Sequence, residues 1–138
     1  MSVEIRYRLR NGSEIVGYSR KMKGSKTLFF SRDQFWWNGT PIAHEQVDES
    51  TGLRDINNRP IFEMDIVNYA LEDGRERQGA VLWSAKQETF IIKDLVQRDL
   101  HIPLEVEGLS LFEPRDLKFH AFLFNHLDLM IELGVRDE

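Results

Sequence analysis

Glu63 and Asp65 are the pair of residues whose types and spacing most directly suggest chemistry. Residues two apart on a β-strand point to the same face, so the two carboxylates would lie side by side. Such a pair can raise one pKa and serve general acid–base or glycosidase reactions. Beside a turn, however, carboxylates accept backbone N–H groups and fix how the chain enters a strand. The spacing alone leaves a catalytic and a structural interpretation open.

Histidines are the other candidate groups. His120 and His126 lie close to Asp128, which resembles a metal site only loosely. The chain lacks an H-E-x-x-H segment, a phosphate-binding glycine loop and a G-x-S-x-G elbow. It also has no cysteine, which excludes disulfides, thiolate metal sites and thiol catalysis. We therefore expect ordinary surface or hydrogen-bonded histidines, no cofactor and no enzymatic activity.

The net charge of −5 is unevenly distributed along the chain. Residues 1–30 carry seven basic and two acidic residues, a net charge of +5, whereas residues 31–138 carry 11 basic and 21 acidic residues, a net charge of −10. This asymmetry indicates a basic arm for a polyanion, self-complementary association, or, as we favour, a strand pair with a solvated charged face. The candidate polyanion contacts are Arg6, Arg8, Arg10, Lys21, Lys23 and Lys26.

Residues 35–42 predict an aromatic hairpin, with Asn38-Gly39 as its tight turn and Pro41 on an edge arm. Adjacent residues of a strand face opposite sides, so one of Trp36 and Trp37 would be exposed. An exposed tryptophan can anchor a protein interface or stack on a base. The alternative is that a loop or the terminal helix buries both side chains.

The N-terminal segment predicts a β-hairpin. Val3, Ile5, Tyr7 and Leu9 alternate with charged residues, Asn11-Gly12 marks the turn, and residues 14–18 return. We expect a loop over the basic residues 19–27, a short strand at 28–30 and a polar connector at 44–50.

The stretch 51–83 predicts a turn followed by apolar strands. Residues 55–58 are turn-forming, and Pro60 suits a sheet edge or the first residue of a strand. Strands follow at 61–62, 66–69 and 78–83, with Asp73-Gly74 as a two-residue type I′ turn. We assign Trp83 to the core.

This stretch resembles the YopX-type proteins of bacteriophages and prophages, which carry a T-G-L-x-D-x-N-G-x-x-I-[YF]-E-G-D-I-V block and then a G-x-V-x-W strand. Asn58 and Met64 stand where the family usually has glycine, and residues 123–129 resemble the family's closing segment more weakly. The family has no assigned activity, so the resemblance implies a phage context and the structural interpretation of Glu63 and Asp65. A bacterial cytoplasm is expected from the absence of cysteine and of a membrane-spanning run. The residues that carry the resemblance are Thr51, Gly52, Leu53, Asp55, Asn57, Ile61, Phe62, Glu63, Asp65, Ile66, Val67 and Trp83, with Gly79 and Val81.

The last third of the chain predicts further strands and one helix. Strands are expected at 88–92, along the alternation at 100–106 and at 119–124, with residues 93–99 open between loop and short helix. Asn125 is expected to cap a final helix that Gly134 ends.

These elements predict a mainly β fold: a small antiparallel β-barrel or sandwich, an SH3-like barrel being one possibility, with one short C-terminal helix. The length predicts a single domain over 1–138, with hairpins in 1–50 and the central strands, closing strand and helix in 51–134. No apolar run reaches the roughly 20 residues that cross a bilayer, so no membrane partner is expected.

The leading functional hypothesis is a non-enzymatic phage or prophage protein that binds itself or another phage or host protein. The second is nucleic-acid binding by a small barrel through the basic N-terminal hairpin, which the acidic remainder of the chain disfavours. The third is an enzyme whose site combines Glu63, Asp65 and a histidine.

Overall fold

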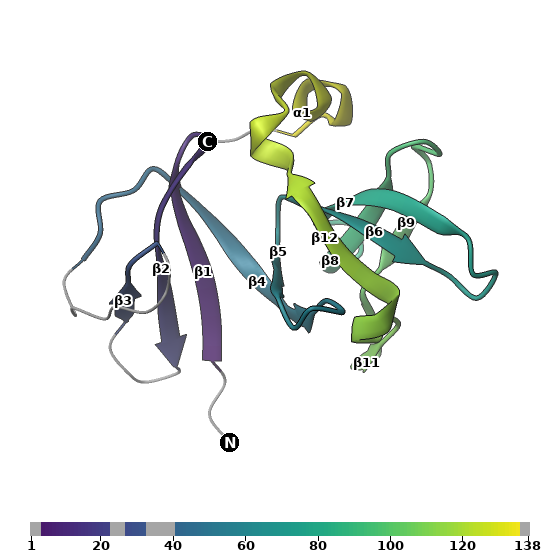
Figure 1. Cartoon of the computed structure of the whole chain (residues 1–138), viewed down its shortest axis with the longest axis horizontal. Helices are drawn as coiled ribbons and strands as arrows, with labels where there is room; N and C mark the ends of the chain where they lie inside the picture. The colour runs from purple at the N-terminus through teal and green to yellow at the C-terminus, as the bar shows by residue number, and fades with distance from the viewer. Residues whose placement is uncertain (1–3, 23–26, 33–40, 136–138) are drawn as a thin grey trace. The chain divides into compact units, whose positions relative to one another are not determined.

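The computed structural model describes residues 4–22, 27–32 and 41–135 (Figure 1). Within these described residues, antiparallel sheets and one short C-terminal helix confirm the mainly β class, and the sheets are not closed into a barrel. The chain forms two compact units, residues 1–50 with 127–138 and residues 51–126. Among the described residues, no helix is long and apolar enough to cross a membrane.

The first unit contains the predicted N-terminal hairpin. Asn11 pairs with Glu14, so the two-residue loop is Gly12-Ser13, one position later than predicted, and Gly12 adopts φ 61°. The strand order of the first sheet is β3-β2-β1-β4-β5. Its strands are β1 (Glu4–Asn11), β2 (Glu14–Met22), β3 (Leu28–Phe30), β4 (Gln46–Arg54) and β5 (Pro60–Phe62). β4 begins in the first unit and ends in the 51–126 unit, and β5 belongs to the 51–126 unit.

Two polar segments predicted as a loop and a connector form strands instead. Residues 19–22 continue β2, and residues 46–50 begin β4. Their sequences lack apolar alternation, yet both segments pair in register with β1. Asp48 lies directly opposite Arg8, and Ser19 opposite Tyr7. The pairing partner, which is distant in sequence, decides the structure here.

The second unit is built on a sheet with the order β12-β6-β7-β8-β9. Its strands are β6 (Asp65–Ala70), β7 (Glu76–Ser84), β8 (Thr89–Asp94), β9 (His101–Pro103) and β12 (Leu117–Phe122). The strands predicted at 61–62, 66–69, 78–83 and 88–92 are confirmed. A small two-stranded sheet and two 3-10 turns complete it: β10 (Glu105–Val106), β11 (Leu109–Ser110), η1 (Pro114–Asp116) and η2 (Leu123–Asn125).

The predicted two-residue turn at Asp73-Gly74 is wrong, although the hairpin is confirmed. Ala70 pairs with Glu76, which leaves a five-residue loop over 71–75. The Gly74 N–H donates to the Leu71 carbonyl at 2.9 Å, and Gly74 adopts φ 71°. The glycine therefore supplies left-handed backbone at the end of a longer turn.

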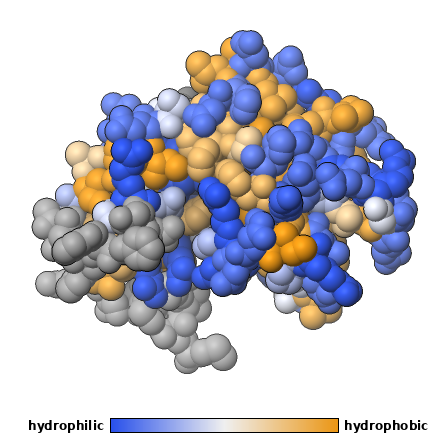
Figure 2. All heavy atoms as spheres, in the orientation of Figure 1, coloured by the Kyte–Doolittle hydropathy of each residue, from blue (hydrophilic) through white to orange (hydrophobic). Residues whose placement is uncertain are grey.

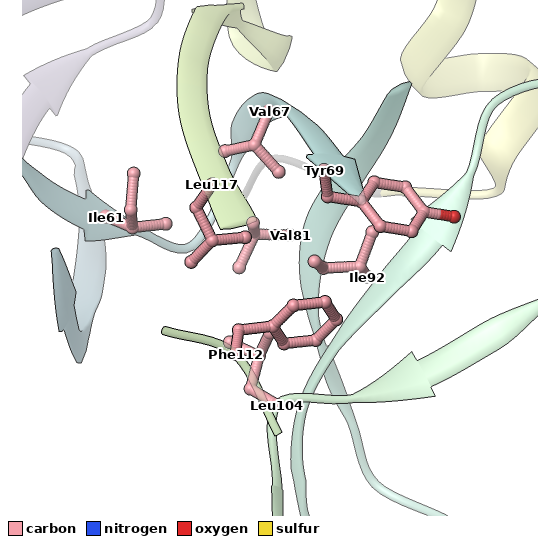
Figure 3. Close-up of a cluster of buried hydrophobic side chains, with 8 residues drawn as sticks. All are labelled: Ile61, Val67, Tyr69, Val81, Ile92, Leu104, Phe112 and Leu117. Carbon is pink, nitrogen blue, oxygen red and sulfur yellow. The ribbon is translucent and has the colours of Figure 1, made fainter. Parts of the chain in front are cut away.

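The core of the second unit is an apolar cluster drawn from its main sheet and the segments beside it (Figure 3). Gly79 belongs to the close packing, because a Cβ there would overlap the Ile92 side chain and crowd the Tyr69 ring. The Tyr69 hydroxyl points away from the other labelled side chains in Figure 3. The cluster consists of Ile61, Val67, Tyr69, Val81, Ile92, Leu104, Phe112 and Leu117.

Trp83 is not a core residue, contrary to the prediction, since half of its surface (50%) is exposed. The pairing of β6 with β7 ends at Ala80, so Trp83 lies where β7 pairs only with β8. It packs edge-on against Phe90, its cross-strand partner, with ring centroids 5.1 Å apart. Trp83 is exposed because β6 ends before it can cover this part of β7.

The C-terminal helix α1 (Leu127–Leu133) confirms the predicted helix, and Gly134 follows it with φ 71°. The strand predicted at 119–124 is instead β12 at Leu117–Phe122, two residues earlier and of the same length, because residues 123–125 form η2. Asn125 is therefore not the helix cap. Residues 95–99 form bends and a turn rather than a helix.

Candidate functional site

Asp55 holds the turn that precedes β5. Its side chain is buried, and Oδ1 accepts the N–H groups of Asn57 and Arg59, each at 2.9 Å. Its Oδ2 accepts the N–H of Phe119 at 2.9 Å, and the Ile56 N–H donates to the Leu117 carbonyl. The turn thereby covers the edge of β12, an outer strand of its sheet, which protects that edge from pairing with another chain. We conclude that Asp55 is a structural carboxylate.

Glu63 and Asp65 do not form a carboxylate pair on one strand. Glu63 and Met64 form the turn between β5 and β6, and Asp65 begins β6. Asp65 is buried and accepts the Phe62 N–H at 2.8 Å across that turn. Asp65 therefore acts as the structural interpretation predicted, whereas Glu63 lies in the turn instead of on a strand face.

Arg8 and Arg10 are buried rather than solvated, each with 1% exposure. Arg8 Nε and Arg10 Nε both donate to Asp48 Oδ2 at 2.7 Å, and Arg10 Nη2 donates to Oδ1 at 2.9 Å. Antiparallel pairing of β1 with β4 places Asp48 opposite Arg8 and two residues from Arg10's partner, Gln46. A polyanion cannot reach these guanidinium groups without unpacking the sheet, so the solvated-face interpretation is wrong for both.

The other predicted contacts are distributed differently. Arg6 is half-buried and Lys21 is exposed on β2, while Lys23, Lys26, Trp36 and Trp37 lie outside the described residues. For the predicted aromatic hairpin, the described end at Pro41 and Ile42 contains no strand.

A groove with a volume of about 760 Å³ lies in the second unit, and no residue lining it was predicted as a site. The loop between β6 and β7, β9 and the segment from Ser110 to Asp116 form its walls. We call it the acidic groove. Its apolar lining consists of Ala70, Leu71, Ile102, Leu111 and Phe112, and its acidic lining of Glu72, Asp73, Glu113 and Asp116, with Arg115 as its cation.

Hydrogen bonds fix both walls of the acidic groove. Asp73 accepts the Arg75 N–H and binds both terminal nitrogens of Arg77, at 3.0 and 2.7 Å. These bonds hold the pKa of Asp73 below its ordinary value, so it stays ionised. On the other wall, Asp116 Oδ2 accepts the Glu113 N–H at 2.9 Å, and Phe112 packs edge-on against Tyr69 of the core. The groove is therefore preorganised by bonds within its own unit.

A smaller polar pocket of about 380 Å³ lies beside Asp94. The buried Asp94 carboxylate accepts the Tyr69 hydroxyl at 2.6 Å and the N–H groups of Val96 and Gln97 at 2.9 and 2.7 Å. Burial raises the pKa of Asp94, but the hydrogen bonds outweigh it and leave the pKa lowered. Burial, and then the bond to Asp94, raise the pKa of Tyr69. The hydroxyl of Tyr69 and the carboxylate of Asp94 therefore both have hydrogen-bond partners within the fold, which gives them a structural role.

All four histidines are exposed, as expected. His44 Nδ1 lies 2.7 Å from the Ile42 carbonyl oxygen, and His101 Nε2 lies 3.2 Å from that of Arg98. In the part of the chain that the structure describes, no three His, Asp or Glu residues are placed to hold a metal ion.

Comparison with known proteins adds no relative: no family model matches the chain, and no curated protein or solved structure matches it significantly. The acidic groove could not be predicted from the sequence, because its carboxylates come from positions 72–73 and 113–116, which only the fold brings together. The available signal was the acidic excess after residue 30, which gives a sign of charge but no location.

Proposed function

We propose that this chain is a non-enzymatic protein-interaction module, whose partner is another protein or a second copy of itself. The observation that carries the proposal is the acidic groove. It combines a partly exposed apolar floor with a rim of fixed polar groups, which is the arrangement of protein–protein interfaces. Leu111 is 50% exposed within it and offers apolar surface for a partner to bury.

A phage or prophage origin and a location in the bacterial cytoplasm form part of the proposal. The origin rests on the resemblance of residues 51–83 to YopX-type proteins, and the location rests on the absence of cysteine. Two backbone angles support that resemblance, because Asn58 (φ 62°) and Met64 (φ 75°) adopt the left-handed conformation at the positions where the family usually has glycine.

The proposal is tested by selecting binders from a random peptide-display library with the wild-type protein and with Leu111→Asn. Leu109→Asn is the matched control, because Leu109 is also exposed but does not line the acidic groove. Sedimentation of the same three proteins over a concentration series measures self-association. Thermal unfolding establishes that the variants are folded.

We expect the wild type and Leu109→Asn to enrich a common peptide class or to self-associate, and Leu111→Asn to lose that behaviour. Absence of both peptide enrichment and self-association in the wild type would overturn the proposal. Equal behaviour of Leu111→Asn and wild type would also overturn it, because the interaction would then not use the groove.

A further inference from the structure

The floor of the acidic groove is apolar and continuous with the core of the second unit. Leu71 and Ile102 are half-buried and pack against the core cluster, and Leu111 rises from the same lining with half of its surface exposed. In Figure 2, hydrophobic residues also reach the surface, among hydrophilic ones, where Figure 1 places β11. A ligand side chain seated on this floor would have to be apolar to gain from burial.

The rim of the groove is anionic. Four carboxylates and one guanidinium line it, a net charge of −3, which becomes −2 when Arg77, bound to Asp73 from outside the lining, is counted. Arg115 binds Glu113, with Nε 2.9 Å from Oε2, so these two charges offset each other and Glu72 and Asp116 carry the remaining negative charge. The rim therefore favours cations and repels phosphates or carboxylates that approach it.

The geometry points to a cationic, amphipathic segment of a partner protein as the occupant of this groove. Apolar side chains of that segment contact Leu71, Ile102 and Leu111, while its Lys or Arg side chains meet Glu72, Glu113 and Asp116. This inference rests on the proposed function and specifies the partner's chemistry. Alternation of basic and large apolar residues is the property that recognition requires.

Recognition through side chains is favoured over addition of a strand to the sheet. Of the two strands of the main sheet that border the groove, β6 is an inner strand and β9 is an outer strand in the sheet order. β9 contains Pro103, which has no N–H to offer an added strand. The groove therefore selects its partner by charge and apolar contact.

The test is fluorescence anisotropy with three labelled peptides of about 12 residues, a length suited to a groove of this kind. One peptide alternates Lys and Leu, the second alternates Glu and Leu, and the third alternates Lys and Ser. The proteins are the wild type, Glu72→Lys/Glu113→Lys, and the control Glu105→Lys/Glu107→Lys. The control makes the same change of charge at exposed residues outside the groove.

We expect the wild type and the control to bind the Lys–Leu peptide at least about tenfold more tightly than either other peptide, with affinity falling as salt rises. Glu72→Lys/Glu113→Lys should lose at least about tenfold of that affinity and gain affinity for the Glu–Leu peptide. Equal binding of the Lys–Ser peptide, unchanged binding by the groove variant, or no binding of the Lys–Leu peptide would each overturn the inference. Enrichment of anionic or neutral peptides in the library selection would overturn it too, while leaving the proposed function standing.

Discussion

Charged side chains are buried in one region of the molecule and exposed in another. In the first unit, Arg8 and Arg10 point inward and are bound by Asp48, so a basic strip in the sequence becomes part of a sheet interior. In the second unit, the carboxylates of the acidic groove lie at the surface around an apolar floor. The charge counted along the sequence therefore predicts the negative surface charge of the second region correctly. It overstates the positive surface charge of the first region, because two of its arginines are buried.

The two regions also hold buried carboxylates by different means. Asp48 is satisfied by guanidinium groups from a strand 38 and 40 residues away in sequence. Asp55 is satisfied by three backbone N–H groups, two of them within four residues. The first arrangement depends on charge, whereas the second depends on the shape of a turn.

The largest effect is expected from Asp48→Ala, which removes the carboxylate that both buried arginines bind. Breaking a buried ion pair from one side costs about 3–5 kcal/mol, so urea unfolding should show a loss of that size. Adding Arg10→Met should restore part of the stability, because it removes one buried charge. A loss below about 1 kcal/mol for Asp48→Ala would show that the cluster is not stabilised by charge pairing.

Asp55→Ala should cause the next largest loss of unfolding free energy, about 3 kcal/mol, because three N–H groups lose their acceptor. Hydrogen exchange should report faster exchange at Phe119, on the edge of β12. Asp55→Asn should lose less, since the amide oxygen keeps one acceptor. Unlike Asp48→Ala, Asp55→Ala should not regain stability when a cationic residue is removed. A gain of stability would contradict the view that backbone N–H groups, and not charges, satisfy Asp55.

Tyr69→Phe should cost about 1 kcal/mol through the lost bond to Asp94. The pKa of Asp94 is lowered in the folded state, so its stabilisation is present above its ordinary value of 3.8 and is lost as pH falls below it. The pKa of Tyr69 is raised, so its contribution is lost as pH rises above 10. In urea unfolding measured from low pH to above pH 10, Tyr69→Phe should reduce the loss of unfolding free energy at both ends. The same pH dependence in the variant and the wild type would contradict the role of the bond between Tyr69 and Asp94.

The smallest effect is expected from Asn58→Gly, which should stabilise the protein by a few tenths of a kcal/mol. Asn58 is exposed and adopts φ 62°, where glycine has no Cβ to strain. Met64→Gly should instead destabilise, because Met64 is buried at φ 75° and its side chain would be lost from the core. Thermal unfolding of the two variants should therefore shift in opposite directions.

The sequence predicts the fold best where structure is decided locally. The turn at Asp55, the strands that follow it and the N-terminal hairpin follow from turn residues and alternation within a few positions. Asp48 could not be placed, because its partners are brought by pairing of β1 with β4. Trp83 was misplaced for a related reason: its exposure depends on where β6 ends, which no pattern within β7 reveals.

The most direct test compares the two regions in one experiment. Binding of the wild-type protein to the Lys–Leu peptide and to random-sequence duplex DNA is measured in the same low-salt buffer. We expect the peptide to bind, Glu72→Lys/Glu113→Lys to lose that binding, and DNA to remain unbound. Salt-sensitive binding of DNA without binding of the peptide would contradict the account, because the basic hairpin would then be the functional surface.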